Sequence, residues 1–128
     1  MAIGETDRTS TVARGRRAEA IAALFLEIDG YRVLARNVRC GPLEVDLVAA
    51  RGETVVFVEV RARSSRLHGT PEESVRRHKR ERITHAAERL CEAWGLSPRA
   101  RVRFDVIAVE LEPFGLRLRH RLGYWHPR

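Results

Sequence analysis

The chain has 128 residues, a formal net charge of +7 and two cysteines. This length is typical of a single domain, and two cysteines exclude a disulfide framework or a metal site built from cysteine alone. The positive charge favours a polyanionic partner, nucleic acid, over an anionic membrane surface. No signal peptide is recognisable, and the apolar segments are far shorter than the ~20 residues of a membrane span. We therefore expect a cytoplasmic protein with reduced thiols that binds no membrane.

The first predicted element is a helix from about Val12 to Asp29. Apolar residues recur within it at helical spacing, and Gly30 follows at the place of a helix terminator. The residues before the helix are mostly polar. We therefore expect residues 1–12 to be disordered and residues 13–128 to form one domain.

Three strands are predicted to follow, at Tyr31–Val38, Leu43–Ala50 and Thr54–Arg61. Apolar and β-branched residues alternate or run together in each of them. The segment Arg51-Gly52-Glu53 separates the second strand from the third and favours a turn. The last two of these strands are therefore expected to form a hairpin.

The second half of the chain predicts another helix and two more strands. The helix begins at Thr70, where Pro71 and Glu73 complete a capping box, and it ends near Gly95. Strands are predicted at Val102–Leu111 and Leu116–Leu122, joined by a turn at residues 113–115. The predicted fold is therefore α/β, a mixed sheet flanked by helices in the order αβββαββ.

The predicted hairpin brings two acidic residues into register. A turn at Arg51-Gly52-Glu53 places Asp46 opposite Glu59 or diagonal to it, and opposed side chains have Cβ atoms about 5 Å apart. Two carboxylates at that distance repel each other unless a divalent cation lies between them. Mg²⁺ is held by one or two carboxylates together with substrate phosphate. The hairpin therefore indicates a candidate metal site.

Two further charged residues lie on helix faces that otherwise read as apolar. Glu19 is followed by Ala22, Ala23 and Leu26 at i+3, i+4 and i+7, which places it on or beside the buried stripe. Lys79 is the only lysine among the 24 basic residues, and it falls four residues after Val75. A charged side chain on a buried face needs a partner, so both residues are candidates for the same site.

A structural interpretation of these charges is equally open on the residues alone. An acid in a strand near Arg61 and Arg63 can form an ion pair, and inward charges guard an edge strand against aggregation. Glu19 and Lys79 can extend their side chains along the core surface toward water. By the same reasoning, Asp105 is predicted to pair with Arg103 or another arginine, and the five histidines to lie on the surface.

Several segments in order, from about Gly15 to Val109, closely resemble the YraN-like family of small bacterial proteins. They are GRRAEAIAALFLEIDGYRVLARNVRC, LEVDLVA, FVEVRAR, PEESVRRHKRERI and RFDVIAV. The resemblance implies a restriction-endonuclease-like fold of the PD-(D/E)XK class, which includes archaeal Holliday junction resolvases. It implies that Asp46 and Glu59 bind the metal, that Glu19 is the acid from the first helix, and that Arg61 stands where the motif has lysine.

The activity implied by the resemblance is endonuclease-like hydrolysis of a phosphodiester in branched or structured DNA, with Mg²⁺ or Mn²⁺ as cofactor. Asp46, Glu59 and Glu19 would hold the metal, while Arg61 and Lys79 would supply positive charge at the reacting phosphate. A homodimer is implied by analogy with the resolvases. Contacts to the nucleic-acid backbone are predicted for basic residues of the third strand and second helix: Arg61, Arg63, Arg76, Arg77, Lys79 and Arg80.

One substitution keeps two alternatives to this activity open. Arg61 retains the positive charge of a lysine and can bind phosphate bidentately, but an arginine does not act as a base toward water. The first alternative is therefore a catalytically decayed nuclease fold that binds nucleic acid without cleaving it. The second is a structural protein in which the same acids form ion pairs.

Overall fold

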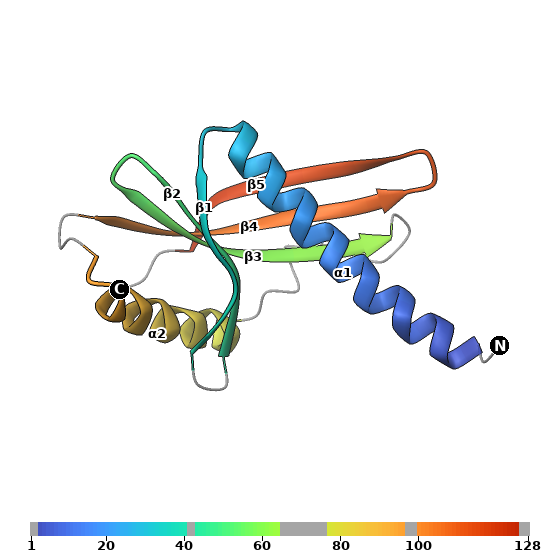
Figure 1. Ribbon diagram of the computed structural model, residues 1–128, viewed down its shortest axis with the longest axis horizontal. Coiled ribbons are helices and arrows are strands. Elements are labelled where there is room, and N and C mark those ends of the chain that lie inside the picture. Colours follow the sequence, from blue (N-terminus) through green and yellow to red (C-terminus); the bar gives the residue numbers. More distant parts are fainter. Residues whose placement is uncertain (1–2, 41–42, 65–76, 97–99, 126–128) are drawn as a thin grey trace.

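The computed structural model describes residues 3–40, 43–64, 77–96 and 100–125 (Figure 1). Its order of elements is the predicted αβββαββ. The elements are α1 (Ile3–Ile28), β1 (Arg32–Cys40), β2 (Leu43–Arg51), β3 (Thr54–Ser64), α2 (Arg77–Ala93), β4 (Arg101–Glu112) and β5 (Gly115–Trp125). The predicted capping box at residues 70–73 lies outside the described residues.

The five strands form one sheet in the order β1-β2-β3-β4-β5. Strands β3 and β4 are parallel and the other neighbouring pairs are antiparallel, so the sheet is mixed as predicted. Parallel neighbours need a crossover connection, and the chain between β3 and β4 contains α2. Figure 1 shows β1 running steeply across the direction of β3, β4 and β5, as in a strongly twisted sheet.

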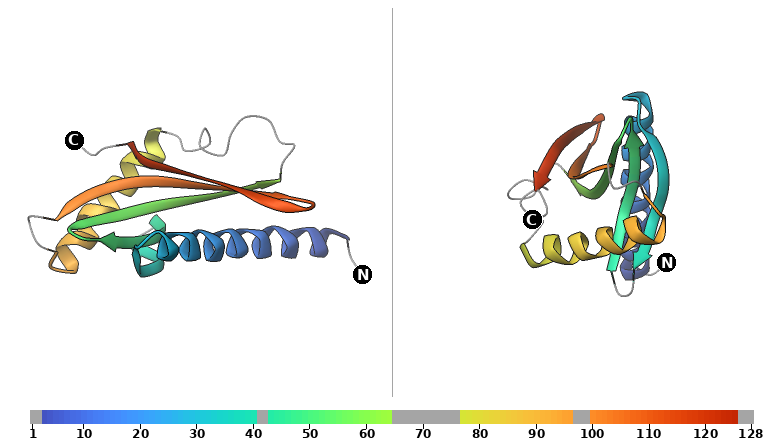
Figure 2. Two further views of the ribbon diagram at one scale, coloured as in Figure 1. Left: turned by 90° about the horizontal axis from the view of Figure 1, so that it is seen from above. Right: turned by 90° about the vertical axis from the view of Figure 1, so that its left-hand side faces the viewer.

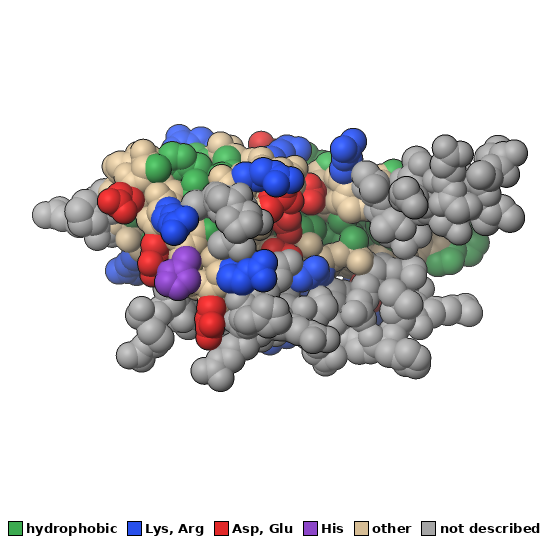
Figure 3. Space-filling view, turned by 90° about the horizontal axis from the view of Figure 1, so that it is seen from below, with side chains coloured by type: hydrophobic (Ala, Val, Ile, Leu, Met, Phe, Trp, Pro, Cys, Tyr) green, Lys and Arg blue, Asp and Glu red, His purple; other side chains and the backbone are tan. Residues whose placement is uncertain are grey.

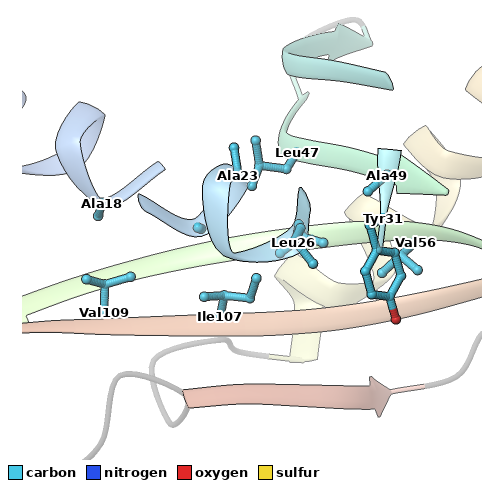
Figure 4. Close-up of a cluster of buried hydrophobic side chains, with 11 residues drawn as sticks. Ala18, Ala23, Leu26, Tyr31, Leu47, Ala49, Val56, Ile107 and Val109 are labelled. Atoms are coloured by element: carbon cyan, nitrogen blue, oxygen red, sulfur yellow. The ribbon is translucent and has the colours of Figure 1, made fainter. Parts of the chain in front are cut away.

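Helix α1 covers one face of the sheet and buries an apolar cluster that we call the α1-side core. Ala18, Ala22, Ala23 and Leu26 are fully buried on the helix, and the small alanines allow it to pack closely on the strands. Figure 4 shows Ala18 near Val109 and Leu26 near Ile107 of β4, and Ala23 beside Leu47 of β2. Figure 2 shows α1 lying alongside the strands. The strand members of this core are Leu47, Ala49, Val56, Val58, Ile107 and Val109.

Helix α2 covers the opposite face and buries a second cluster, the α2-side core. Its buried residues on the helix are Ala86, Ala87 and Leu90, which follow helical spacing. Phe57 and Phe104 from the parallel strands stack beneath them, with ring centroids 5.6 Å apart. The two cores lie on opposite faces of one sheet, which explains why β3 and β4 are apolar on both faces.

Helix α1 ends where the sequence predicts and begins earlier. The Gly30 amide donates to Glu27 and the Tyr31 amide to Leu26, which closes the helix as a Schellman motif. At the other end α1 begins at Ile3, although residues 1–12 were expected to be disordered. Once a helix is nucleated, extending it by a residue adds a hydrogen bond at little cost. No described helix is both long and apolar enough to cross a membrane.

Gly15 and Gly30 are expected to respond oppositely to alanine. Gly30 has φ +91°, a conformation that side chains disfavour, so Gly30→Ala should destabilise the protein by about 1 kcal/mol or more. Gly15 lies inside α1, and a Cβ there would meet no atom within 4 Å. Gly15→Ala should therefore stabilise it by up to about 1 kcal/mol. Urea unfolding of both variants measures the effects, and equal signs would contradict the prediction.

Candidate functional site

Asp46 lies where the β2–β3 ladder stops. The hairpin has the predicted register, and its last pair is Leu47 opposite Val58, immediately before Asp46 and Glu59. Asp46 reaches across the gap, and its Oδ2 accepts a hydrogen bond of 2.8 Å from the Val60 amide. The Asp46 carboxylate is therefore fixed beside the residue that follows Glu59.

Glu59 is buried and paired with the arginine two residues further along the strand. Because Phe57 belongs to the α2-side core, strand alternation directs Glu59 and Arg61 toward the same face. The Glu59 side chain is 4% exposed, and its Oε1 lies 3.2 Å from Nη2 of Arg61, which is 28% exposed. The Nε of Arg61 is buried and has no hydrogen-bond partner among the described atoms. The Glu59 carboxylate is therefore both a predicted metal ligand and the acid of the predicted ion pair with arginine.

The third predicted acid is not brought to this position. Glu19 is half-buried on α1, the helix that covers the other face of the sheet. Among the residues that the structure describes, no three His, Cys, Asp or Glu side chains are arranged to hold a metal ion. Asp46 and Glu59 alone remain a suitable donor set for Mg²⁺, which commonly keeps waters and binds through one or two carboxylates. The residues fit a hydrated cation and not a cage of three carboxylates.

The basic residues predicted to contact nucleic acid are only partly visible. Arg61 is described, whereas Arg76 lies outside the described residues. The side chains of Arg63, Arg77, Lys79 and Arg80 also lie outside the described part, although their backbones belong to β3 and α2. Their roles stay predictions. Figure 3 shows the molecule from below, with acidic side chains near the middle of this face and basic side chains beside them.

A second polar cluster is buried on the α1 side of the sheet, around Asp105. Nε and Nη2 of Arg103 each donate to this carboxylate at 2.9 Å, which confirms the predicted Asp105–Arg103 pair. The Gly123 amide donates at 2.8 Å, and Nε2 of His120 lies 2.6 Å away. The prediction of a surface histidine is wrong for His120, whose side chain is 6% exposed. His85 is exposed as predicted.

The Asp105 carboxylate has a structural role because its acceptor capacity is filled. Burial raises the pKa of Asp105, but hydrogen bonds from His120, Arg103 and the Gly123 amide outweigh burial and bring the pKa below its usual value. Each oxygen takes two of the four contacts, which is the full capacity of a carboxylate. Because the ionised carboxylate only accepts, His120 donates from Nε2.

The same cluster ties the end of α1 to the sheet. Arg103 Nη2 donates to the Tyr31 hydroxyl at 2.6 Å, and the bond to Asp105 raises the pKa of Arg103. The guanidinium of Arg51 lies 4.3 Å from the centre of the Tyr31 ring. Apart from the Arg103–Asp105 pair, these contacts join segments far apart in the chain, so no local pattern in the sequence indicates them.

Similar proteins carry the same family description. This chain is 50% identical to a UPF0102 protein of Moorella thermoacetica, over 77% of this chain and 82% of the relative. It is 45% identical to one of Symbiobacterium thermophilum, over 84% and 90% respectively. A solved structure of Pyrococcus furiosus SfsA in complex with Ca²⁺ is also similar. The match covers 88% of this chain and 64% of that chain, at 18% identity and a TM-score of 0.39. Residues 18–109 match the uncharacterised protein family UPF0102, and the chain belongs to that family, as the YraN-like resemblance predicted.

Proposed function

We propose that the protein binds structured DNA and hydrolyses its phosphodiesters with Mg²⁺ or Mn²⁺ held at Asp46 and Glu59. One observation carries the proposal: the Val60 amide holds the Asp46 carboxylate next to buried Glu59, where the β2–β3 ladder stops. Two carboxylates at neighbouring positions of a sheet favour a divalent cation. It would bind Asp46 and Glu59 in addition to the partners that they already have.

The chain's own residues would contribute orientation and positive charge. Val60 holds one Asp46 oxygen through its amide, which restricts the orientation of the carboxylate. Glu59 holds the Arg61 guanidinium in place, and a guanidinium can bind phosphate oxygens bidentately. The bound metal would supply a Lewis acid for the phosphate and lower the pKa of a coordinated water. The net charge of +7 would favour binding to the DNA backbone irrespective of sequence.

The second candidate function is nucleic-acid binding without cleavage. The observation that favours it is the Arg61–Glu59 contact of 3.2 Å at the place of the motif's lysine. An arginine stays protonated and cannot serve as the base that activates water. In this case the acids would be retained for ion pairing, and the basic surface would still bind DNA.

Metal binding gives the first test of the proposed site. Titration calorimetry with Mn²⁺ and with Mg²⁺ should show saturable binding to the unmodified protein and none to Asp46→Ala. Glu44→Ala is the matched control, because Glu44 lies in the same strand and forms an exposed pair with Arg39. It should bind metal like the unmodified protein. Equal binding by Asp46→Ala would rule out the site.

DNA binding and cleavage are separated by assaying Asp46→Ala on labelled four-way junctions. The variant should retain binding in a gel-shift assay, because phosphate contacts from arginine supply most of the affinity. It should show no cleavage with either metal. If Asp46→Ala lost DNA binding together with cleavage, Asp46 would instead support the fold or the DNA contact.

We also propose a homodimer, since a two-fold junction is matched by a two-fold protein. Size-exclusion chromatography with light scattering, with and without junction DNA, measures the oligomeric state. A monomer under both conditions would contradict this part of the proposal.

A further inference from the structure

We infer that Asn37 is a positioning residue, which turns Asp46 of the neighbouring strand into the β2–β3 gap. The inference rests on the proposed function, because it assigns Asn37 a role in building the Asp46–Glu59 site. Asn37 lies in β1 and has φ +50°, and it is the one non-glycine residue with positive φ in the described part of the chain. A positive φ is strained for most residues and better tolerated by asparagine.

The pairing of β1 with β2 places Asn37 opposite Asp46. Arg36 pairs with Leu47 and Val38 with Val45, and these two pairs enclose Asn37 and Asp46. The register is the same on both sides, so neither strand has gained a residue there. The irregularity is therefore a rotation of the two strands and not an insertion in one.

Side-chain burial shows the rotation in both strands. Ala35 and Val38 both pack against the α2-side core, although residues three apart point to opposite faces of a regular strand. Val45 and Val48 of β2 lie in the same core at the same spacing. Both strands thus change face between these residues, at Asn37 and at Asp46.

The rotation decides where the Asp46 carboxylate lies. Leu47 faces the α1-side core, so an unrotated β2 would direct Asp46 into the α2-side core and Val45 to the opposite face. Instead Val45 takes the place in the α2-side core, and Asp46 accepts the Val60 amide at 2.8 Å. Because paired residues flank the rotation, β2 cannot turn unless β1 turns with it. Asn37 supplies that turn through its backbone, and its side chain is exposed.

The test compares three substitutions at Asn37. Glycine accepts positive φ freely, alanine less well, and valine poorly. Hydrogen exchange of the Val60 amide, followed by NMR, reports whether Asp46 still accepts its hydrogen bond, and Asp46→Ala gives the unprotected reference. We expect Asn37→Gly to keep Val60 protection and Asn37→Val to reduce it by about tenfold, as expected for a strained backbone conformation. Arg32→Val, another exposed β1 position, should leave it unchanged.

Metal titration of the same proteins separates this inference from the proposed function. Asn37→Gly should bind Mn²⁺ as the unmodified protein does, and Asn37→Val about tenfold more weakly. If Asn37→Val loses Val60 protection while no protein, the unmodified one included, binds metal, the result supports the positioning role of Asn37 and contradicts the metal site. If Asn37→Val does not fold, Asn37→Ala replaces it: protection below that of Asn37→Gly supports the inference. Equal protection in the glycine, alanine and valine variants overturns it.

Discussion

Asp105→Asn is expected to destabilise the protein by about 3 kcal/mol or more, because removing one partner of a buried charged pair leaves the others uncompensated. Asparagine has nearly the shape of aspartate, so packing changes little. It cannot accept from Arg103, His120 and Gly123 as the carboxylate does. The total stability of a domain of this size is about 5–15 kcal/mol. Urea unfolding followed by circular dichroism measures the loss.

Glu112→Gln provides the control for Asp105→Asn. Glu112 pairs with Arg117 at 3.7 Å in a largely exposed contact at the end of the β4–β5 hairpin. Exposed ion pairs contribute about 0–1 kcal/mol, so this variant should unfold near the midpoint of the unmodified protein. If both variants lost similar amounts of stability, the network around Asp105 would not have the role assigned to it.

Acid should weaken the unmodified protein through the same carboxylate. The pKa of Asp105 is lower in the folded protein than the value of about 3.9 that aspartate has in an unfolded chain. The unfolded state therefore binds more protons in acid, so this contribution is complete above the unfolded pKa and is lost as the pH falls through the folded pKa. The unfolding free energy should fall more steeply below pH ~4 in the unmodified protein than in Asp105→Asn. Parallel pH profiles would contradict this assignment.

Arg61→Lys should raise the rate of junction cleavage by about 10²-fold or more, the typical contribution of a positioned acid or base. Lysine keeps the charge beside Glu59, is smaller, and can lose its proton and act as a base toward water, which arginine cannot. The substitution also removes the buried, unpartnered Nε of Arg61. We therefore expect no loss of stability. Single-turnover cleavage of a labelled four-way junction with Mg²⁺ or Mn²⁺ measures the rate.

Two further proteins make the Arg61→Lys result specific. Arg36→Lys is the same replacement at an exposed position and should leave the rate unchanged. The double variant Asp46→Ala, Arg61→Lys should lose whatever activity the single variant gains. Faster cleavage by the unmodified protein would show that the guanidinium supports the reaction. Absence of cleavage in both proteins, with binding retained, would favour the function of binding alone.

Local features of the sequence were sufficient to predict the elements and their order. The glycines that end α1 and α2 are both followed by closing hydrogen bonds of the Schellman type. The short turn at residues 51–53 set the β2–β3 register, and with it the approach of Asp46 to Glu59. These features depend on residues close together in the chain, where spacing and turn chemistry decide the geometry.

Only the tertiary structure decided which charged residues meet. His120 reaches Asp105 from β5, and Tyr31 reaches Arg103 from the end of α1. The sequence gives no sign that the histidine is buried there. Glu19 follows the apolar stripe of its helix as predicted, but α1 packs on the face of the sheet opposite Glu59. The rotation at Asn37 depends on the pairing of two strands. A sequence fixes periodicity within an element, whereas the face on which an element packs follows from the burial of all the others.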